Sequence, residues 1–266
     1  MTPVDVARGD GPVVLGMPHG GTYVPQEIRA RLNDRGRSLA DTDWNIHKLY
    51  EGLLPGATIV RARFHRYVID ANRDPSGESL YPGQNTTGLV PLTDFDGAPI
   101  WREAPSGGEV EHRRETFHAP YHAALEAEMA RVRDRHGVAV LYDCHSIRSH
   151  IPFLFDGTLP DFNIGTNEGA TCAPAIARAV EEVCRAAEGY STVVNGRFKG
   201  GWTTRHYGRP GTGWHAIQME LAQSTYMAEA APWPYLHERA DAIRPHLTEA
   251  LRRIDALARE LGCDTA

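Results

Sequence analysis

The sequence has few cysteines, and none of them lies in a C-x-x-C pair. Only Cys144, Cys172, Cys184 and Cys263 occur among 266 residues. The amino terminus has no basic stretch followed by a long apolar run, which is the mark of a secretory signal. A disulfide framework is therefore not expected, because such frameworks belong mainly to small secreted domains. We predict reduced thiols and a soluble, cytoplasmic protein.

The sequence also lacks long apolar runs and an excess of basic residues. No run of about 18 apolar residues is present that could span a bilayer. The formal net charge is −6, and 28 Lys and Arg are scattered among 34 Asp and Glu, so no basic field suited to a nucleic-acid backbone is expected. We predict neither a membrane nor a nucleic acid as partner. The oligomeric state is not decided by the sequence.

What the sequence does contain is an alternation of strand-like and helix-like segments. Buried strands are predicted where short apolar runs stop at turn formers, at 11–17, in two runs within 57–75, and at 138–147, 190–195 and 214–221. Helices are predicted by apolar spacing at 39–54, at 110–136 with an interruption near Pro120 and a left-handed cap at Gly137, at 170–189, and at 235–261. Segments 76–108 and 196–213 are predicted to be long loops.

This alternation predicts one α/β domain spanning residues 1–266, with a mixed, mainly parallel sheet covered on both faces. In such sheets, ligands bind at the carboxyl ends of the strands. Three polar residues stand at such ends, namely His19, His145 and Glu220. A single histidine after a strand is more often a hydrogen-bonded structural residue. The coincidence of all three favours a functional site.

Two histidines and one carboxylate are a sufficient ligand set for a hydrolytic zinc site that keeps one position open for water. His19 and His145 supply the nitrogens, and Asp43 is the favoured carboxylate. The alternatives for that ligand are Asp41, Asp143 and His47. An aspartate at the start of a helix is also a routine cap, which is the competing interpretation of Asp41 and Asp43.

The sequence also contains a second pair of histidines that could bind a metal. His118 and His122 lie one helical turn apart and could chelate a metal, but Pro120 between them disturbs the regular spacing. Zinc is the default ion, although cobalt and manganese suit the same ligand types.

Seven segments together resemble the pattern of the N-formylglutamate amidohydrolase (N-formylglutamate deformylase) family, in order and roughly from His19 to Tyr226. They are MPHGG (17–21), DTDW (41–44), RYVIDANRDP (66–75), LYDCHSI (141–147), DFNIGTN (161–167), KGGWTTRHYG (199–208) and IQMELAQSTYM (217–227). This family is similar in turn to carboxypeptidase-like zinc hydrolases such as aspartoacylase and succinylglutamate desuccinylase. The resemblance implies a three-layer α/β/α domain of the phosphorylase/hydrolase-like, zinc-carboxypeptidase-like kind. One departure is that those relatives use a His-x-x-Glu pair, whereas His19 is followed by Gly20, Gly21 and Thr22.

The resemblance also implies an activity, the metal-dependent hydrolysis of N-formyl-L-glutamate to formate and L-glutamate in histidine degradation. Metal-bound water would attack the formyl carbon, with Glu220 as general base and then general acid. Arg66 is similarly spaced to an arginine that polarises the carbonyl in the relatives.

A dicarboxylate substrate requires cationic partners, and arginine forks suit carboxylates. Asn72 and Arg73 resemble the Asn-Arg pair that holds a substrate carboxylate in the wider superfamily. Arg205 and His206, in the glycine-rich loop, are candidates for the second carboxylate, and Thr166 is a weaker candidate for anion binding near an expected helix start. Two alternatives stay open: a related metal amidohydrolase for another N-acyl acidic amino acid, and a non-catalytic protein that binds acidic metabolites.

Overall fold

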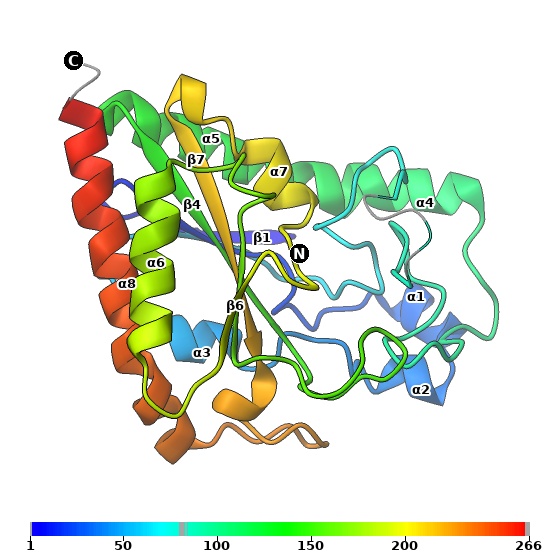
Figure 1. Ribbon diagram of the computed structural model, residues 1–266. Helices are drawn as coiled ribbons and strands as arrows, with labels where there is room; N and C mark the ends of the chain where they lie inside the picture. Colours follow the sequence, from blue (N-terminus) through cyan, green and yellow to red (C-terminus); the bar gives the residue numbers. More distant parts are fainter. Residues whose placement is uncertain (1, 80–82, 84, 264–266) are drawn as a thin grey trace.

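The protein is built around a seven-stranded mixed sheet (Figure 1). The computed structural model describes residues 2–79, 83 and 85–263. The strands are β1 (Val4–Ala7), β2 (Val13–Met17), β3 (Thr58–Ala62), β4 (Ala139–Ile147), β5 (Phe162–Gly165), β6 (Thr192–Val194) and β7 (Trp214–Ala222). Their order across the sheet is β1-β3-β2-β4-β7-β5-β6.

The centre of the sheet is parallel. Strands β3, β2, β4 and β7 run in one direction, whereas β1 is antiparallel to β3 and β5 is antiparallel to β7. The predicted mixed, mainly parallel sheet is therefore confirmed. The carboxyl ends of four neighbouring strands meet at one edge of the sheet, which is the edge where α/β proteins place their sites.

Helices cover both faces of the sheet. The helices of the described residues are α1 (Gln26–Arg31), α2 (Asp34–Arg37), α3 (Ile46–Tyr50), α4 (Gly107–Arg113), a π-helical turn (Arg114–His118), α5 (Ala119–His136), α6 (Pro174–Ala186), α7 (Trp202–Tyr207) and α8 (His237–Cys263), with 3₁₀ turns at Pro210–Thr212 and Gln223–Thr225. Helices α3, α6 and α8 share a core with one face of the sheet, and α5 shares a second core with the other face. Helices α6 and α8 lie side by side over the first face (Figure 1).

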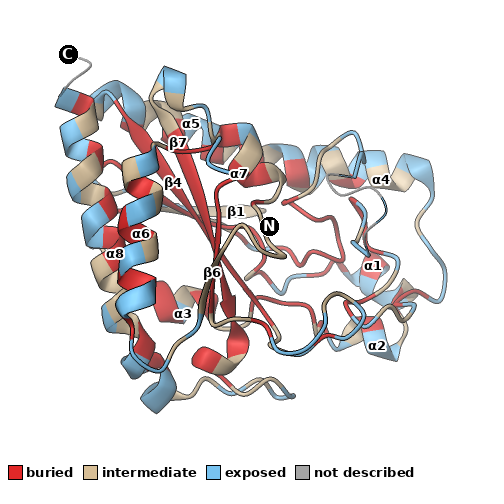
Figure 2. Cartoon of the chain, in the orientation of Figure 1, coloured by how far each residue is buried: buried red, intermediate tan, exposed pale blue. Residues whose placement is uncertain are grey.

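Strand β4 explains how a buried strand can carry polar side chains. All nine of its residues are buried, and Figure 2 shows the central strands in red beneath helices with exposed outer surfaces. Because side chains alternate along a strand, Tyr142 and Cys144 pack in the core beneath α3, α6 and α8, while Leu141 packs beneath α5. Asp143 and His145 follow the phase of Leu141, so they lie on the α5 face.

Three local predictions were wrong. The helix expected at 39–54 is only the five residues of α3, and its preceding residue Asn45 is left-handed, with φ of 60°. The second strand-like run within 57–75 forms turns instead, because the N–H of Tyr67 donates to His65 Nδ1 and that of Val68 to the His65 carbonyl, and such local bonds replace a strand ladder. The glycine-rich segment 196–213 contains the short helix α7, so it is not a continuous loop.

Other local predictions were confirmed. Gly137 ends α5 with φ of 73°, as expected for a left-handed cap. The interruption near Pro120 is the π-helical turn, in which the Ala119 N–H bonds to the Arg114 carbonyl five residues earlier. All four cysteines are free thiols. No helix among the described residues has the length and apolar character needed to cross a bilayer.

Candidate metal centre and active site

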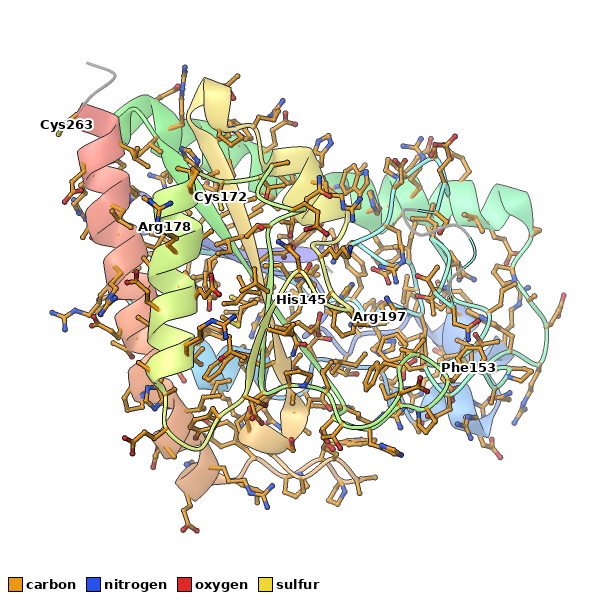
Figure 3. The ribbon with its side chains drawn as sticks, viewed as in Figure 1. His145, Phe153, Cys172, Arg178, Arg197 and Cys263 are labelled. Carbon is orange, nitrogen blue, oxygen red and sulfur yellow. The ribbon has the colours of Figure 1, made fainter. Side chains whose placement is uncertain are left out.

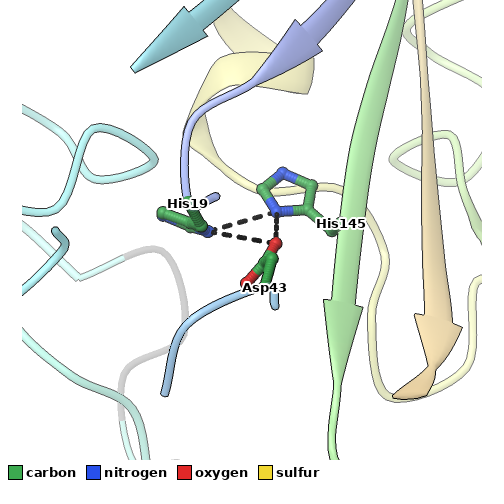
Figure 4. A group of neighbouring side chains, drawn as sticks. All are labelled: His19, Asp43 and His145. Atoms are coloured by element: carbon green, nitrogen blue, oxygen red, sulfur yellow. Dashed lines mark hydrogen bonds and ion pairs between the residues drawn. The ribbon is translucent and has the colours of Figure 1, made fainter. Parts of the chain in front are cut away.

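Three buried side chains from distant parts of the chain converge at the carboxyl edge of the sheet (Figure 4). His19 follows β2, His145 lies near the end of β4, and Asp43 lies in the turn before α3. The two Nδ1 atoms are 3.2 Å apart. Asp43 Oδ2 lies 3.3 Å from the Nδ1 of His145 and 3.9 Å from that of His19.

Asp43 does not act as a helix cap. Asn45 precedes α3, and the Asp43 carboxylate instead turns toward the sheet, where Oδ2 accepts a hydrogen bond from the Ser146 N–H at 3.1 Å. The Asp43 N–H donates to the His19 carbonyl at 3.1 Å, which ties the turn to the segment after β2. Backbone contacts therefore hold Asp43 against both histidines.

A second layer of carboxylates orients the two imidazoles. His19 Nε2 lies 2.6 Å from Asp70 Oδ1, and His145 Nε2 lies 3.1 Å from Asp143 Oδ1. Since a carboxylate accepts hydrogen bonds, each Nε2 is assigned as the protonated nitrogen when the imidazole is neutral. Both Nδ1 lone pairs then face the centre, which is the arrangement that carboxylate–histidine pairs give to metal ligands.

The electrostatics differ between the two histidines. Burial lowers the pKa of His19 to about 4, with a further lowering from the Arg66 guanidinium. Burial also acts to lower the pKa of His145, but the carboxylates of Asp143 and Asp43 outweigh it and hold that pKa well above its usual value. In the absence of a cation, a proton on His145 thus relieves the repulsion between two facing lone pairs.

The geometry fits a small divalent ion. A tetrahedral zinc site with Zn–N distances of about 2.0–2.1 Å places its ligand atoms about 3.3 Å apart. Two of the three separations at this site, 3.2 and 3.3 Å, agree with that value, and the third is 3.9 Å. Two imidazole nitrogens and a carboxylate oxygen are also the donor set expected for catalytic zinc.

The alternative ligands lie elsewhere. Asp41 Oδ2 accepts hydrogen bonds from the Tyr67 hydroxyl and the Phe95 N–H at 2.7 and 2.9 Å. Asp143 accepts from the Thr204 hydroxyl at 2.9 Å and stands behind His145. Within residues 2–79, 83 and 85–263, one group of three or more metal-binding side chains is close enough to hold an ion, and it includes neither these aspartates nor His47.

Glu220 stands beside the candidate metal centre. It is the register partner of His145 on the neighbouring parallel strand, so both side chains point to the same face. Its Oε2 accepts a hydrogen bond from Gln218 Nε2 at 3.1 Å. Burial raises the pKa of Glu220 to about 8, while the nearby His145 acts in the opposite direction.

Arg66 is buried rather than exposed on a strand. One guanidinium nitrogen lies 2.6 Å from Asp43 Oδ1, and the group stacks 4.9 Å from the centre of the Phe95 ring. Because Arg66 contacts the metal-facing carboxylate and also lines the adjacent cavity, it is placed to act on a group bound there.

A cavity of about 190 Å³ opens directly onto this centre. His19, His145 and Glu220 form part of its wall, and Asn72 and Arg73 lie in the same lining. Thr87 fixes the Arg73 guanidinium through its carbonyl at 2.8 Å and its hydroxyl at 2.9 Å. Gly201 packs so tightly on Asn72 that a Cβ at that position would lie 2.3 Å from the Asn72 amide nitrogen.

Sequence reasoning missed Arg197, which also lines the cavity. Its Nε donates to the Leu154 carbonyl at 3.0 Å and a terminal nitrogen donates to the Asn85 carbonyl at 2.9 Å. Figure 3 shows Arg197 on the side of His145 that faces Phe153. The only sequence signal for Arg197 was its position in the glycine-rich segment 196–213, where Arg205 was the predicted substrate residue.

Three predicted substrate residues lie outside the cavity lining. Thr166 follows β5 and is not near a helix start, and its hydroxyl accepts a hydrogen bond from Asn195 Nδ2 at 2.9 Å. Arg205 Nε donates to the Gly200 carbonyl. His206 is exposed and stacks on Trp202 at 4.3 Å.

The chain is similar to known proteins in both sequence and structure. The model of the N-formylglutamate amidohydrolase family matches residues 11–227. A curated protein of Pseudomonas aeruginosa named N-formylglutamate deformylase is 49% identical over 256 residues, covering 95% of this chain and 96% of the relative. A protein of the same name from Pseudomonas putida is 47% identical with the same coverage. The crystal structure of an N-formylglutamate amidohydrolase from Ralstonia eutropha JMP134 has a TM-score of 0.81 and 28% identity, covering 98% of this chain and 99% of that one.

Proposed function

Because the chain belongs to the N-formylglutamate amidohydrolase family, we propose that it hydrolyses N-formyl-L-glutamate to formate and L-glutamate with the help of a divalent metal ion, by default zinc. The observation that carries the proposal is the convergence of two imidazole nitrogens and one carboxylate oxygen at the wall of an arginine-lined cavity. The role in histidine degradation that the family resemblance implies is part of the same proposal.

His19, Asp43 and His145 would hold the ion. When bound, the ion would supply positive charge that polarises the substrate carbonyl and lowers the pKa of water. Glu220, buried in the cavity wall beside His145, takes a proton from the attacking water and delivers it to the leaving nitrogen. The hydrogen bond from Gln218 to Oε2 keeps this carboxylate in place during both transfers.

Arg66 serves two purposes in this proposal. Its ion pair with Asp43 holds the carboxylate in the orientation that faces the histidines. Its guanidinium also lines the cavity, where it stabilises negative charge that develops on the formyl oxygen. Burial strengthens this interaction, because charges attract more strongly where water is excluded.

The two carboxylates of the substrate need separate cationic partners. Arg73 and Arg197 line the same cavity from different segments of the chain, and backbone carbonyls fix the direction of both side chains. We assign the substrate carboxylates to these two arginines, with the Asn72 amide beside Arg73. Arg205, His206 and Thr166 lie outside the cavity lining, so we propose no contact between them and the substrate.

The first prediction concerns the reaction itself. Purified protein is expected to release formate from N-formyl-L-glutamate, to lose this activity after chelation, and to regain it when zinc is added back. Formate release and metal content should be measured on the same preparation. Activity that persists after the metal has been removed would contradict metal dependence, and turnover of N-acetyl or N-succinyl substrates alone would favour the alternative acyl specificity.

The second prediction concerns charge recognition. Arg73→Ala and Arg197→Ala are each expected to lower kcat/KM for N-formyl-L-glutamate about 10- to 100-fold, because a charge-assisted hydrogen bond contributes roughly 1.5–3 kcal/mol. Metal content should not change. Comparison with N-formyl-L-glutamine, which lacks the side-chain charge, assigns the carboxylates: the arginine that binds the side-chain carboxylate affects only the glutamate substrate.

Lys199→Gln is a matched control for Arg197→Ala. It removes a positive charge from the same segment, but Lys199 pairs with Glu168 outside the cavity lining. Its kcat/KM is expected to equal that of the wild type. If Lys199→Gln and Arg197→Ala lower kcat/KM equally, general charge attraction explains the effect and Arg197 does not bind the carboxylate.

A further inference from the structure

One short segment of the chain contacts both candidate metal-binding histidines. Asp70 Oδ1 lies 2.6 Å from His19 Nε2, and Asn72 Nδ2 lies 3.2 Å from His145 Nε2. The Asn72 N–H donates to Asp70 Oδ1 at 2.8 Å, which links the two contacts. The position of residues 70–73 therefore bears on the orientation of the His19 imidazole, to which Asp70 bonds. The Asn72 amide nitrogen and the protonated His145 Nε2 are both donors, so they pack against each other without a hydrogen bond.

The same segment is held from its other side by a second pair of histidines. His122 Nε2 lies 2.8 Å from the Ala71 carbonyl, and His118 Nε2 lies 3.0 Å from the Arg73 carbonyl. The contacts alternate along the segment: side chains 70 and 72 reach the metal centre, and carbonyls 71 and 73 accept from the helix. The two imidazoles lie one helical turn apart, so each can donate a hydrogen bond to one of two carbonyls that are two residues apart in the segment.

These contacts prevent His118 and His122 from chelating a metal through their Nε2 atoms. A carbonyl oxygen only accepts hydrogen bonds, so each Nε2 must carry a proton and cannot bind a metal. The remaining nitrogen of His122, Nδ1, is 3.1 Å from the Tyr207 hydroxyl.

Both imidazoles are fixed in direction. His118 ends the π-helical turn, and such turns are often found at functional sites. Both side chains are buried, and the Trp202 ring packs against each of them, with centroid distances of 5.8 and 4.7 Å. Tyr207 stacks on His122 at 5.9 Å.

We propose that His118 and His122 are positioning residues that set the metal affinity of the centre through residues 70–73. This inference rests on the proposed metal site. Without the two N–H donors, the segment shifts, Asp70 moves with it, and the Nδ1 atom of His19 turns away from that of His145. Neither His118 nor His122 touches the substrate in this proposal.

The test measures zinc affinity of metal-free protein by competition with a chelator, together with thermal unfolding. His118→Asn and His122→Asn place an amide too far from the carbonyl, and each is expected to weaken zinc binding about 10-fold, the lower end of the effect of outer-shell partners. His118→Gln and His122→Gln place an amide N–H near the position of Nε2 and are expected to retain wild-type affinity.

His215→Gln provides the matched control, because the glutamine amide extends past the position of Nδ1, as the asparagine amide falls short of that of Nε2. His215 is also buried and also bonds to backbone, since its Nδ1 accepts from the Ala173 N–H at 3.1 Å, but it makes no described contact with the metal centre. This variant should lose thermal stability with unchanged zinc affinity. Wild-type zinc affinity in both folded asparagine variants would overturn the positioning role alone. Wild-type protein that binds no zinc would overturn the metal centre, and the positioning role with it.

Discussion

Glu220→Gln is expected to fold and bind metal but to be almost inactive. Glutamine keeps the size of the side chain and can still bond to Gln218, but it cannot accept a proton from water or return one to the leaving nitrogen. Because two proton transfers are lost, the fall in kcat should exceed the roughly 10²–10⁴-fold assigned to one such step. KM should change little, since the contacts proposed between the substrate and Arg73 and Arg197 remain.

The fold of this variant should not suffer. Burial raises the pKa of Glu220 to about 8, so in metal-free protein the ionised carboxylate opposes folding as the pH rises from the usual value of 4.5 through 8. A glutamine at this position carries no charge and does not oppose folding. The unfolding temperature of Glu220→Gln at high pH should therefore be at least that of the wild type. Loss of bound metal would make Glu220 a ligand instead. Near wild-type turnover with the metal intact would refute the proposed proton transfers.

His19→Ala and His145→Ala are each expected to lose most of the bound metal and, with it, nearly all activity. One of the three proposed ligands is removed, and the two that remain would hold the ion too weakly against water. Metal content per chain, measured after dialysis, is the readout. Full occupancy in both variants would show that the ion binds elsewhere.

The carboxylate ligand is tested by a matched pair of aspartates. Asp43→Asn should also lose metal, whereas Asp41→Asn should keep it, because Asp41 bonds to Tyr67 and Phe95 and not to the histidines. Both residues are buried, so both variants should lose some stability, and only the metal content separates them. Equal, full occupancy would remove Asp43 from the ligand set.

The sheet and the residues at its edge could be predicted because each signal was local. Apolar runs interrupted by His19, His145 and Glu220 mark strand ends, and parallel strands bring such ends together whatever their separation along the chain. Asp43 was predicted against a competing cap interpretation, and its turn geometry shows that Asn45 takes the position before α3.

The second layer could not be predicted because it depends on tertiary contacts. Nothing in the sequence places Asp70 behind His19, since the run that contains it reads as a strand and folds as turns. Arg197 and Arg205 look equivalent in a glycine-rich segment, and only the path of the segment around α7 puts one of them in the cavity lining. The helical spacing of His118 and His122 was noticed, but their backbone partners at Ala71 and Arg73 lie about 50 residues away in the chain.

The strand order also bears on when the sheet of a newly made chain can be completed. Strands β5 and β6 join the rest of the sheet through β7, which is synthesised after both of them. Residues 162–194 must therefore wait for residues 214–222 before they can pair with the central strands, and such non-local pairing slows folding. The same event brings Glu220 beside His145. A chain still on the ribosome that ends before β7 carries both histidines and Asp43 but lacks Glu220, the proposed base, so such a chain is expected to be inactive.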